Sequence, residues 1–225
     1  MSEDTTHAEL VEPKCDTQRL TQVPGAINPL EYAKSSVIRV GDGRGFVAQT
    51  VDKPVIITCA HCLPHMPPAI GGIMMTEERT YPRLVGMLGD EPTITVECLF
   101  VDPVADVAVL GEPDGHELED ESEAYRAFVE EREGLPIAAE QNAALPPGNR
   151  KGAWLTLEGK WVCHSLDVNA RYVWTSERCE AGMSGSPIIL DTVRGTVVGV
   201  VASTAFHPRL VTSLPAWLLR ELVMR

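Results

Sequence analysis

The stretch GMSGSP at residues 182–187 places Ser184 between glycines and directly ahead of an apolar run, residues 188–190. Glycine lets the backbone turn where a Cβ would clash. The same turn would let a substrate carbonyl come close to backbone N–H groups. A nucleophilic serine needs both conditions, and it also needs a base and a group that orients the base. The stretch alone fits an ordinary Gly/Ser turn equally well, so its meaning depends on the rest of the chain.

Length, composition and charge narrow the classes of protein to consider. The 225 residues suffice for one large all-β domain or for two fused halves of about 100 residues each. The net charge of −13 argues against a nucleic-acid or anionic-membrane partner, since both bind basic faces. No run of 18 apolar residues occurs, so we expect no membrane span. The acidic amino terminus lacks the features of a secretory signal, and we therefore expect a cytoplasmic protein.

The cysteines allow two interpretations. Without a secretory signal we expect reduced thiols that mostly fill the core. The alternative is a zinc site, because Cys59, His61, Cys62 and His65 offer four ligands within one short segment. Zinc sites of this type usually separate the cysteine pair from the histidine pair by roughly 12–15 residues. Here the pairs overlap, so we predict no metal and no cofactor.

Short β segments dominate the sequence pattern. None of them has helical length or period, and turn residues separate them. We expect six strands in the first half, at residues 36–40, 45–50, 55–58, 81–87, 93–101 and 107–110. Six more are expected in the second half, at residues 152–157, 160–166, 171–176, 187–190, 196–202 and 209–214. Regularly spaced short strands favour barrels or sandwiches.

The segments that flank the strand sets have a different pattern. Residues 1–35 have weak periodicity and are expected to form an irregular arm, followed by a first β half at 36–112. Residues 113–150 form an acidic linker. Tyr125, Phe128 and Val129, at spacings of three and four, predict an amphipathic helix near 117–133. We interpret this helix as a solvated part of the linker, the alternative being a binding surface. The second β half, 151–225, ends in an expected helix at 215–222.

Two further segments complete a recognisable set. TCAHC at residues 58–62 places His61 directly after an apolar strand, and DVAVL at residues 106–110 places Asp106 at the start of another. Together with GMSGSP they stand in the order His, Asp, Ser. They resemble the three signature segments of the chymotrypsin/trypsin-like serine endopeptidases. The tail RLVTSLPAWLLREL and the strand VVGVVAST are also similar to that family, and the resemblance covers residues 36–222.

The resemblance implies an all-β fold of two six-stranded antiparallel barrels with the site between them. Ser184 would attack the scissile carbonyl, His61 would take and return its proton, and Asp106 would orient the imidazole. The backbone N–H groups of Gly182 and Ser184 would form the oxyanion hole. Asp102 competes with Asp106 for the third role, and we favour Asp106 because it adjoins the apolar strand, as in the family pattern.

Departures from the family pattern bear on compartment and activation. No cysteine precedes His61 in the neighbouring strand to pair with Cys62, which agrees with a reducing compartment. Met183 stands where the digestive enzymes carry an aspartate that pairs with a newly cut amino terminus. Activation by that route is therefore not expected, and the chain looks more like the bacterial intracellular members.

The substrate pocket is the least determined feature. The resemblance places Arg178, Cys179, Ala202 and Thr204 around it. Arg178 would attract an acidic substrate side chain or would pair with a neighbouring glutamate. Thr204 replaces the usual glycine, which would narrow the pocket and favour small residues.

Three functions remain open from the sequence. The leading one is a serine endopeptidase that cleaves a protein or peptide substrate. The second is a catalytically silent module of the same fold that binds a peptide or protein partner. The third is a zinc-stabilised structural protein that uses Cys59, Cys62 and His65, with or without His61. For the first, residues 1–35 and the acidic helix are candidates for autoinhibition or for docking a regulatory protein.

Overall fold

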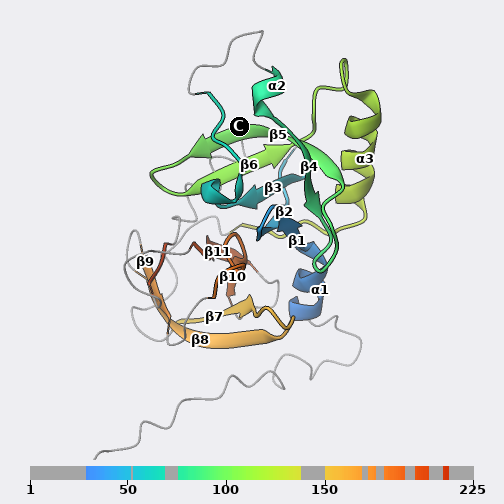
Figure 1. Ribbon diagram of the computed structural model, residues 1–225. Helices are drawn as coiled ribbons and strands as arrows, with labels where there is room; N and C mark the ends of the chain where they lie inside the picture. Colours follow the sequence, from blue (N-terminus) through green and yellow to red (C-terminus); the bar gives the residue numbers. More distant parts are fainter. Residues whose placement is uncertain are drawn as a thin grey trace, which may run out of the picture.

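A computed structural model describes residues 29–51, 53–68, 76–137, 150–168, 172–175, 180–190, 196–202 and 210–212. The first half of the chain forms a closed antiparallel barrel in the order β1-β2-β3-β6-β5-β4 (Figure 1). Its strands are β1 (Val37–Val40), β2 (Gly43–Ala48), β3 (Val55–Thr58), β4 (Thr80–Gly86), β5 (Ile94–Asp102) and β6 (Val107–Gly111). All six lie within a few residues of the predicted positions, because each is a short apolar run bounded by turn residues.

The barrel closes where β1 pairs with β4. β1 and β2 form a hairpin whose loop is only Gly41 and Asp42, since Val40 pairs with Gly43. Pairs between β3 and β6 bring the ends of these two strands together, with Thr58 opposite Ala108. His61 and Asp106 therefore lie at the same end of the barrel. The interior is apolar and fully buried, with large side chains that include Phe46, Ile56, Ile57, Tyr81 and Leu110.

The second half forms one antiparallel sheet in the order β11-β10-β7-β8-β9-β12. Its strands are β7 (Arg150–Leu155), β8 (Trp161–Val168), β9 (Tyr172–Thr175), β10 (Pro187–Leu190), β11 (Val197–Val200) and β12 (Leu210–Thr212). The six strands occur where the sequence predicts them. Within the described ranges no ladder joins β11 to β12, so the closed second barrel stays a prediction.

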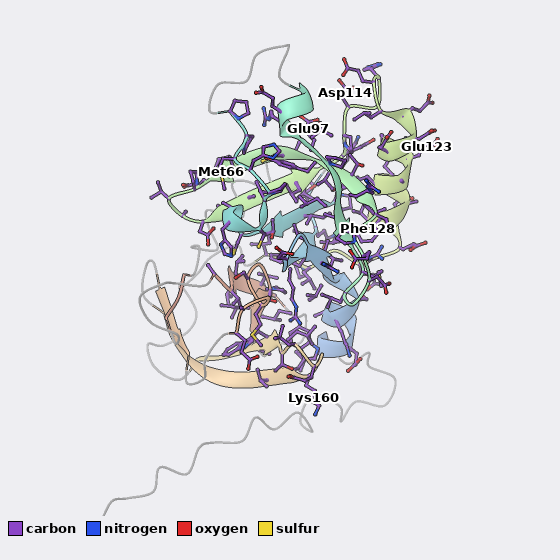
Figure 2. The ribbon with its side chains drawn as sticks, in the orientation of Figure 1. Met66, Glu97, Asp114, Glu123, Phe128 and Lys160 are labelled. Carbon is purple, nitrogen blue, oxygen red and sulfur yellow. The ribbon has the colours of Figure 1, made fainter. Side chains whose placement is uncertain are left out.

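The described helices belong to the first half of the chain. They are α1 (Pro29–Ser36), the 3-10 turn η2 (Ala60–Cys62), α2 (Thr76–Arg79) and α3 (Glu119–Glu130). Figure 2 shows Phe128 of α3 directed towards the barrel and Glu123 directed away from it. The buried face of α3 also contains Tyr125 and Val129, which confirms the predicted amphipathic pattern. The helix is anchored to the barrel, since the Tyr125 hydroxyl donates to the Pro54 carbonyl at 3.2 Å.

Two predicted segments need separate comment. Helix α1 occupies residues 29–36, at the end of the stretch expected to be an irregular arm. Pro29 is compatible with a first helical turn, and Leu30 and Ala33 are buried on one face. The rest of the arm and the helix predicted at 215–222 lie outside the described residues.

A buried arginine joins the two halves. The Arg44 guanidinium, on β2, donates to the Leu155 carbonyl at 2.6 Å and to the Thr156 carbonyl at 2.9 Å. The side chain is only 5% exposed, and burial lowers its pKa. The Arg44 backbone N–H donates to the Ser184 carbonyl at 2.7 Å. One residue of the first barrel therefore holds the serine turn and the end of β7 together.

Candidate active site

His61 lies in the single turn η2 that follows β3. Its backbone N–H donates to Asp106 Oδ1 at 3.0 Å. Its ring Nδ1 lies 3.0 Å from Oδ1 and 2.8 Å from Oδ2 of the same carboxylate. Backbone and ring are thus both fixed by one side chain, and Nε2 is left to face the other way. In this arrangement Asp106 holds the ring orientation and favours the tautomer that has its proton on Nδ1.

Asp106 occupies an unusual backbone conformation. Its φ of 56° lies in the left-handed region, where residues other than glycine are uncommon. The competing residue, Asp102, has a different task. Its Oδ1 accepts the backbone N–H groups of Val104 at 2.9 Å and Ala105 at 3.0 Å, which closes the turn before β6. The geometry therefore directs Asp106, and not Asp102, at the histidine.

The carboxylate changes the acidity of the imidazole. The hydrogen bond that the ring donates to Asp106 raises the pKa of His61 to about 10, and the nearby Cys62 side chain adds to this increase. Burial opposes it, because desolvation disfavours the charged ring. The site thus stabilises an imidazolium, the species that a general base becomes once it has accepted a proton.

The serine turn is held by hydrogen bonds to its backbone. The N–H groups of Met183, Gly185 and Ser186 donate to the carbonyls of Glu180, Val201 and Met183. Among the described residues, the N–H groups of Gly182 and Ser184 donate to no backbone carbonyl. These are the two donors that the resemblance assigns to the oxyanion hole.

Gly185 explains why the turn tolerates no side chain. Its φ is +89°, and a Cβ placed there would lie 1.7 Å from the Arg44 carbonyl oxygen. Such a distance is far below any real contact, so only glycine lets the turn pack against β2. This turn holds Ser184, a residue that is 6% exposed.

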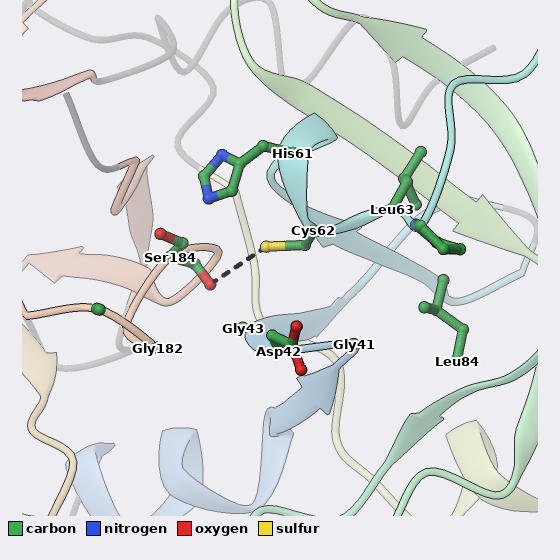
Figure 3. Close-up of a pocket in the computed structure, with 11 residues that line it drawn as sticks. Gly41, Asp42, Gly43, His61, Cys62, Leu63, Leu84, Gly182 and Ser184 are labelled. Carbon is green, nitrogen blue, oxygen red and sulfur yellow. Dashed lines mark hydrogen bonds between the residues drawn. The ribbon is translucent and has the colours of Figure 1, made fainter. Parts of the chain in front are cut away.

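His61 and Ser184 line one pocket of about 510 Å³. The lining also includes Gly182, Asp42, Leu63 and Leu84. Figure 3 shows the His61 ring near Ser184 and the Cys62 sulfur to one side, with a dashed line from the sulfur to the Ser184 carbonyl oxygen. In the part of the chain that the structure describes, no direct hydrogen bond joins His61 to Ser184. Such bonds are often long in the free enzyme and shorten when substrate binds.

The other predicted residues divide into three groups. Arg178, Cys179 and Thr204 lie outside the described residues, so the substrate pocket built on them is untested. Ala202 is described and buried, at 2% exposure. Met183 is buried against Trp154, Ile188 and Val201. It fills an apolar space where a carboxylate would be unfavourable.

The four ligands of the zinc alternative do not gather at one point. The His65 ring packs against Tyr81, with ring centroids 4.8 Å apart. Ligand atoms of Cys59, His61 and Asp106 lie within 4.8 Å of one another instead. Two members of this trio already bond to each other as the histidine–aspartate pair.

Known protein families can now be compared with this chain. A family model described as a trypsin-like peptidase domain matches residues 43–200, which is more than half of the chain. The chain belongs to the trypsin-like peptidase family. The matched region contains His61, Asp106 and Ser184, and membership confirms the prediction of a trypsin-like serine endopeptidase. No curated protein matches the chain.

Solved structures agree with this fold. The peptidase is similar to Rv3671c from M. tuberculosis H37Rv in an inactive form, with 19% identity, a TM-score of 0.54 and 92% of each chain covered. The active form of the same protease aligns with 17% identity and a TM-score of 0.52, covering 100% of this chain and 94% of that one. A serine endoprotease from Yersinia pestis has 17% identity and a TM-score of 0.50, covering 89% of this chain and 66% of that one. At such identities the likeness establishes the fold alone.

Two further features of the peptidase are its helix lengths and the buried Arg44. Among the described residues, no helix is both long and apolar enough to cross a membrane. Sequence reasoning did not identify Arg44, which holds the serine turn. Its only local signal is a charged residue between two glycines inside an apolar strand.

Proposed function

We propose that the chain is a serine endopeptidase in which Ser184, His61 and Asp106 act as a catalytic triad. The proposal rests on the two hydrogen bonds that the backbone and ring of His61 donate to Asp106. These bonds orient the ring at the pocket that His61 shares with Ser184. His61 and Ser184, which are distant in sequence, line one pocket, and Asp106 contacts the histidine.

The proposed reaction has two halves. His61 Nε2 accepts the Ser184 hydroxyl proton while Oγ attacks the substrate carbonyl, and the oxyanion accepts hydrogen bonds from the N–H groups of Gly182 and Ser184. Collapse of this intermediate breaks the peptide bond, and the imidazolium donates its proton to the leaving amine. Water then releases the acyl group by the same steps. Asp106 stabilises the imidazolium throughout.

A cleavage assay tests this function. Wild-type protein and Ser184→Ala are incubated with an unbiased peptide library, and new termini are identified by mass spectrometry. Loss of the serine in such triads lowers kcat by about 10⁶-fold, so Ser184→Ala should yield no specific products. Thr156→Ala, at a half-buried position outside the pocket, is the matched control and should cleave at the same sites. Equal turnover by wild type and Ser184→Ala would remove the triad mechanism.

The silent binding module is the second candidate. It needs the same pocket but no hydrogen bond between His61 and Ser184, and none joins these two residues in the described structure. Peptide binding to the wild type with no turnover at any pH would establish this alternative. An enrichment of bound peptides followed by a search for cleaved products separates the two functions.

The substrate is proposed to be a protein or peptide, as the fold implies. The closed second barrel, the division of the chain at residues 36, 113 and 151, and a regulatory protein partner stay predictions. The same holds for a cytoplasmic location and for exclusion of nucleic acid and membrane. Cleavage specificity, mapped by the library above, would also test the pocket assigned to residues 178–179 and 202–204.

A further inference from the structure

Two cysteines flank His61 within one turn. Cys59 precedes η2 and Cys62 ends it, and the Cys62 backbone N–H donates to the Cys59 carbonyl at 3.1 Å. A turn closed by such a bond brings its first and fourth Cα atoms within about 7 Å. A disulfide spans Cα atoms about 4.4–6.8 Å apart. Each thiol also shifts the pKa of the other, Cys59 upward and Cys62 downward, so the two side chains lie close together.

The Cys62 sulfur is reachable from the active-site pocket. Cys62 is 8% exposed and lines the pocket with His61 and Ser184, whereas Cys59 is fully buried. On the opposite side the sulfur packs on β2, since a Cβ at Gly43 would lie 2.6 Å from it. A small reagent can therefore meet this sulfur only through the pocket. The hydrogen bond from Cys59 and the proximity of His61 lower the pKa of Cys62 to about 5, although burial opposes the shift. The reactive thiolate form is thus favoured at Cys62.

Both thiols also make contacts across the boundary between the two halves. Cys59 Sγ donates to the Val201 carbonyl at 3.3 Å. Cys62 Sγ donates to the Ser184 carbonyl at 3.8 Å, the interaction drawn as a dashed line in Figure 3. A disulfide leaves Cys59 no S–H to donate to the Val201 carbonyl, and it draws the Cys62 sulfur towards Cys59, so its formation would weaken the contacts between the His61 turn and the second half.

We propose that Cys59 and Cys62 form an oxidation site for small peroxides, and that the resulting disulfide switches the peptidase off. The regulatory part rests on the proposed function, whereas the site itself does not. The Cys62 thiolate attacks one peroxide oxygen, the O–O bond breaks, and the leaving hydroxide takes a proton to become water. Cys59 then attacks the Cys62 sulfenic acid, the S–O bond breaks, and a second water leaves with the Cys59 proton. Two thiols lose two electrons in total, and one peroxide is reduced to two waters.

The test combines mass mapping with an activity measurement. Reduced full-length protein is treated with stoichiometric hydrogen peroxide, free thiols are alkylated, and peptides are mapped by mass spectrometry. We expect the peptide containing residues 59–62 to lose two hydrogens and to resist alkylation. Labelling of Ser184 by a fluorophosphonate should slow at least tenfold and should recover after treatment with dithiothreitol.

Variants separate this pair from other thiols. Cys62→Ser should keep its own starting activity after brief peroxide exposure, and Cys59→Ser should stop at the Cys62 sulfenic acid, since neither can close the disulfide. Cys98→Ser is the matched control and should respond as wild type does. Cys98 is also buried and free, but it donates to the Phe100 carbonyl, and burial raises its pKa to about 11.

The outcomes distinguish the two proposals. A disulfide at residues 59–62 in protein whose reduced form is inactive would support the site and would contradict the proposed function. Peroxide treatment that leaves both thiols open to alkylation would overturn the oxidation site, whatever the activity. A disulfide that forms without any change in labelling rate would overturn the switch.

Discussion

Replacing Gly185 by alanine should destabilise the protein through two separable effects. The first is backbone strain, because φ at Gly185 is +89°. A residue with a side chain held in such a region costs about 1–3 kcal/mol. The second is steric, because the added Cβ would lie 1.7 Å from the Arg44 carbonyl oxygen, which is backbone and cannot rotate away. Forcing extra atoms into a packed interior costs about 1–3 kcal/mol more. The sum is about 2–6 kcal/mol.

Gly89→Ala supplies a matched control for the strain alone. Gly89 has nearly the same φ, +92°, but a Cβ there would meet nothing within 4 Å. Gly89→Ala should lower the free energy of unfolding by only about 1–3 kcal/mol. For a chain of this size each kcal/mol lowers Tm by roughly 2–4 °C. Tm measured by circular dichroism, together with urea unfolding, should therefore fall clearly further for Gly185→Ala than for Gly89→Ala. Equal losses in the two variants would refute the close packing of the serine turn on β2.

Three further predictions concern the site and its supports. Asp106→Asn should lower kcat by roughly 10⁴-fold. The acid limb of its kcat/KM profile should also move to lower pH, because the carboxylate that raises the pKa of His61 above 6.5 in the wild type is gone. Arg44→Met should cost about 1–3 kcal/mol in urea unfolding, since it removes the buried donor to the Leu155 carbonyl; an unchanged unfolding midpoint would show that this link between the halves contributes nothing. Glu112→Gln should destabilise α3 packing at neutral pH, because Lys53 first and Ser122 next hold the pKa of Glu112 below its usual value. The stability that this carboxylate contributes is present above about pH 4.5 and is lost as the pH falls through its lowered pKa. The unfolding free energies of wild type and variant should therefore become equal in acid. A difference that persists there would contradict the ion-pair explanation.

The strands and the histidine–aspartate pair were predictable because local sequence determines them. Thr58 and Val107 end and begin apolar runs, and those runs leave His61 and Asp106 at strand ends. A neighbouring strand pairing then brings the two residues together. The choice of Asp106 over Asp102 followed from the same position beside the strand, and the geometry agrees with it.

Other features could not be read from the sequence because they depend on distant partners. Arg44 bonds to carbonyls more than 100 residues away, and nothing near it in sequence indicates them. The need for glycine at position 185 likewise comes from the Arg44 carbonyl. Helix α1 was missed because eight residues with few apolar positions give a weak period, and its stability comes from burial of Leu30 and Ala33.

The cysteines show why burial and reactivity need separate treatment. The sequence predicted reduced thiols that fill the core, and Cys59, Cys62 and Cys98 are indeed free and buried. Only the fold shows that Cys62 also lines the pocket of the proposed triad while Cys98 does not. The same residue type therefore has two environments, which a pattern of positions cannot separate.

Covalent labelling tests the central claim most directly. The full-length reduced protein is incubated with a fluorophosphonate probe at several pH values, and the modified residue is mapped by mass spectrometry. Triad geometry predicts one label, on Ser184, which disappears in Ser184→Ala and is strongly slowed in His61→Ala. Correctly folded protein that takes no label at any pH, or that is labelled at another serine, would contradict the assignment of Ser184 as the nucleophile.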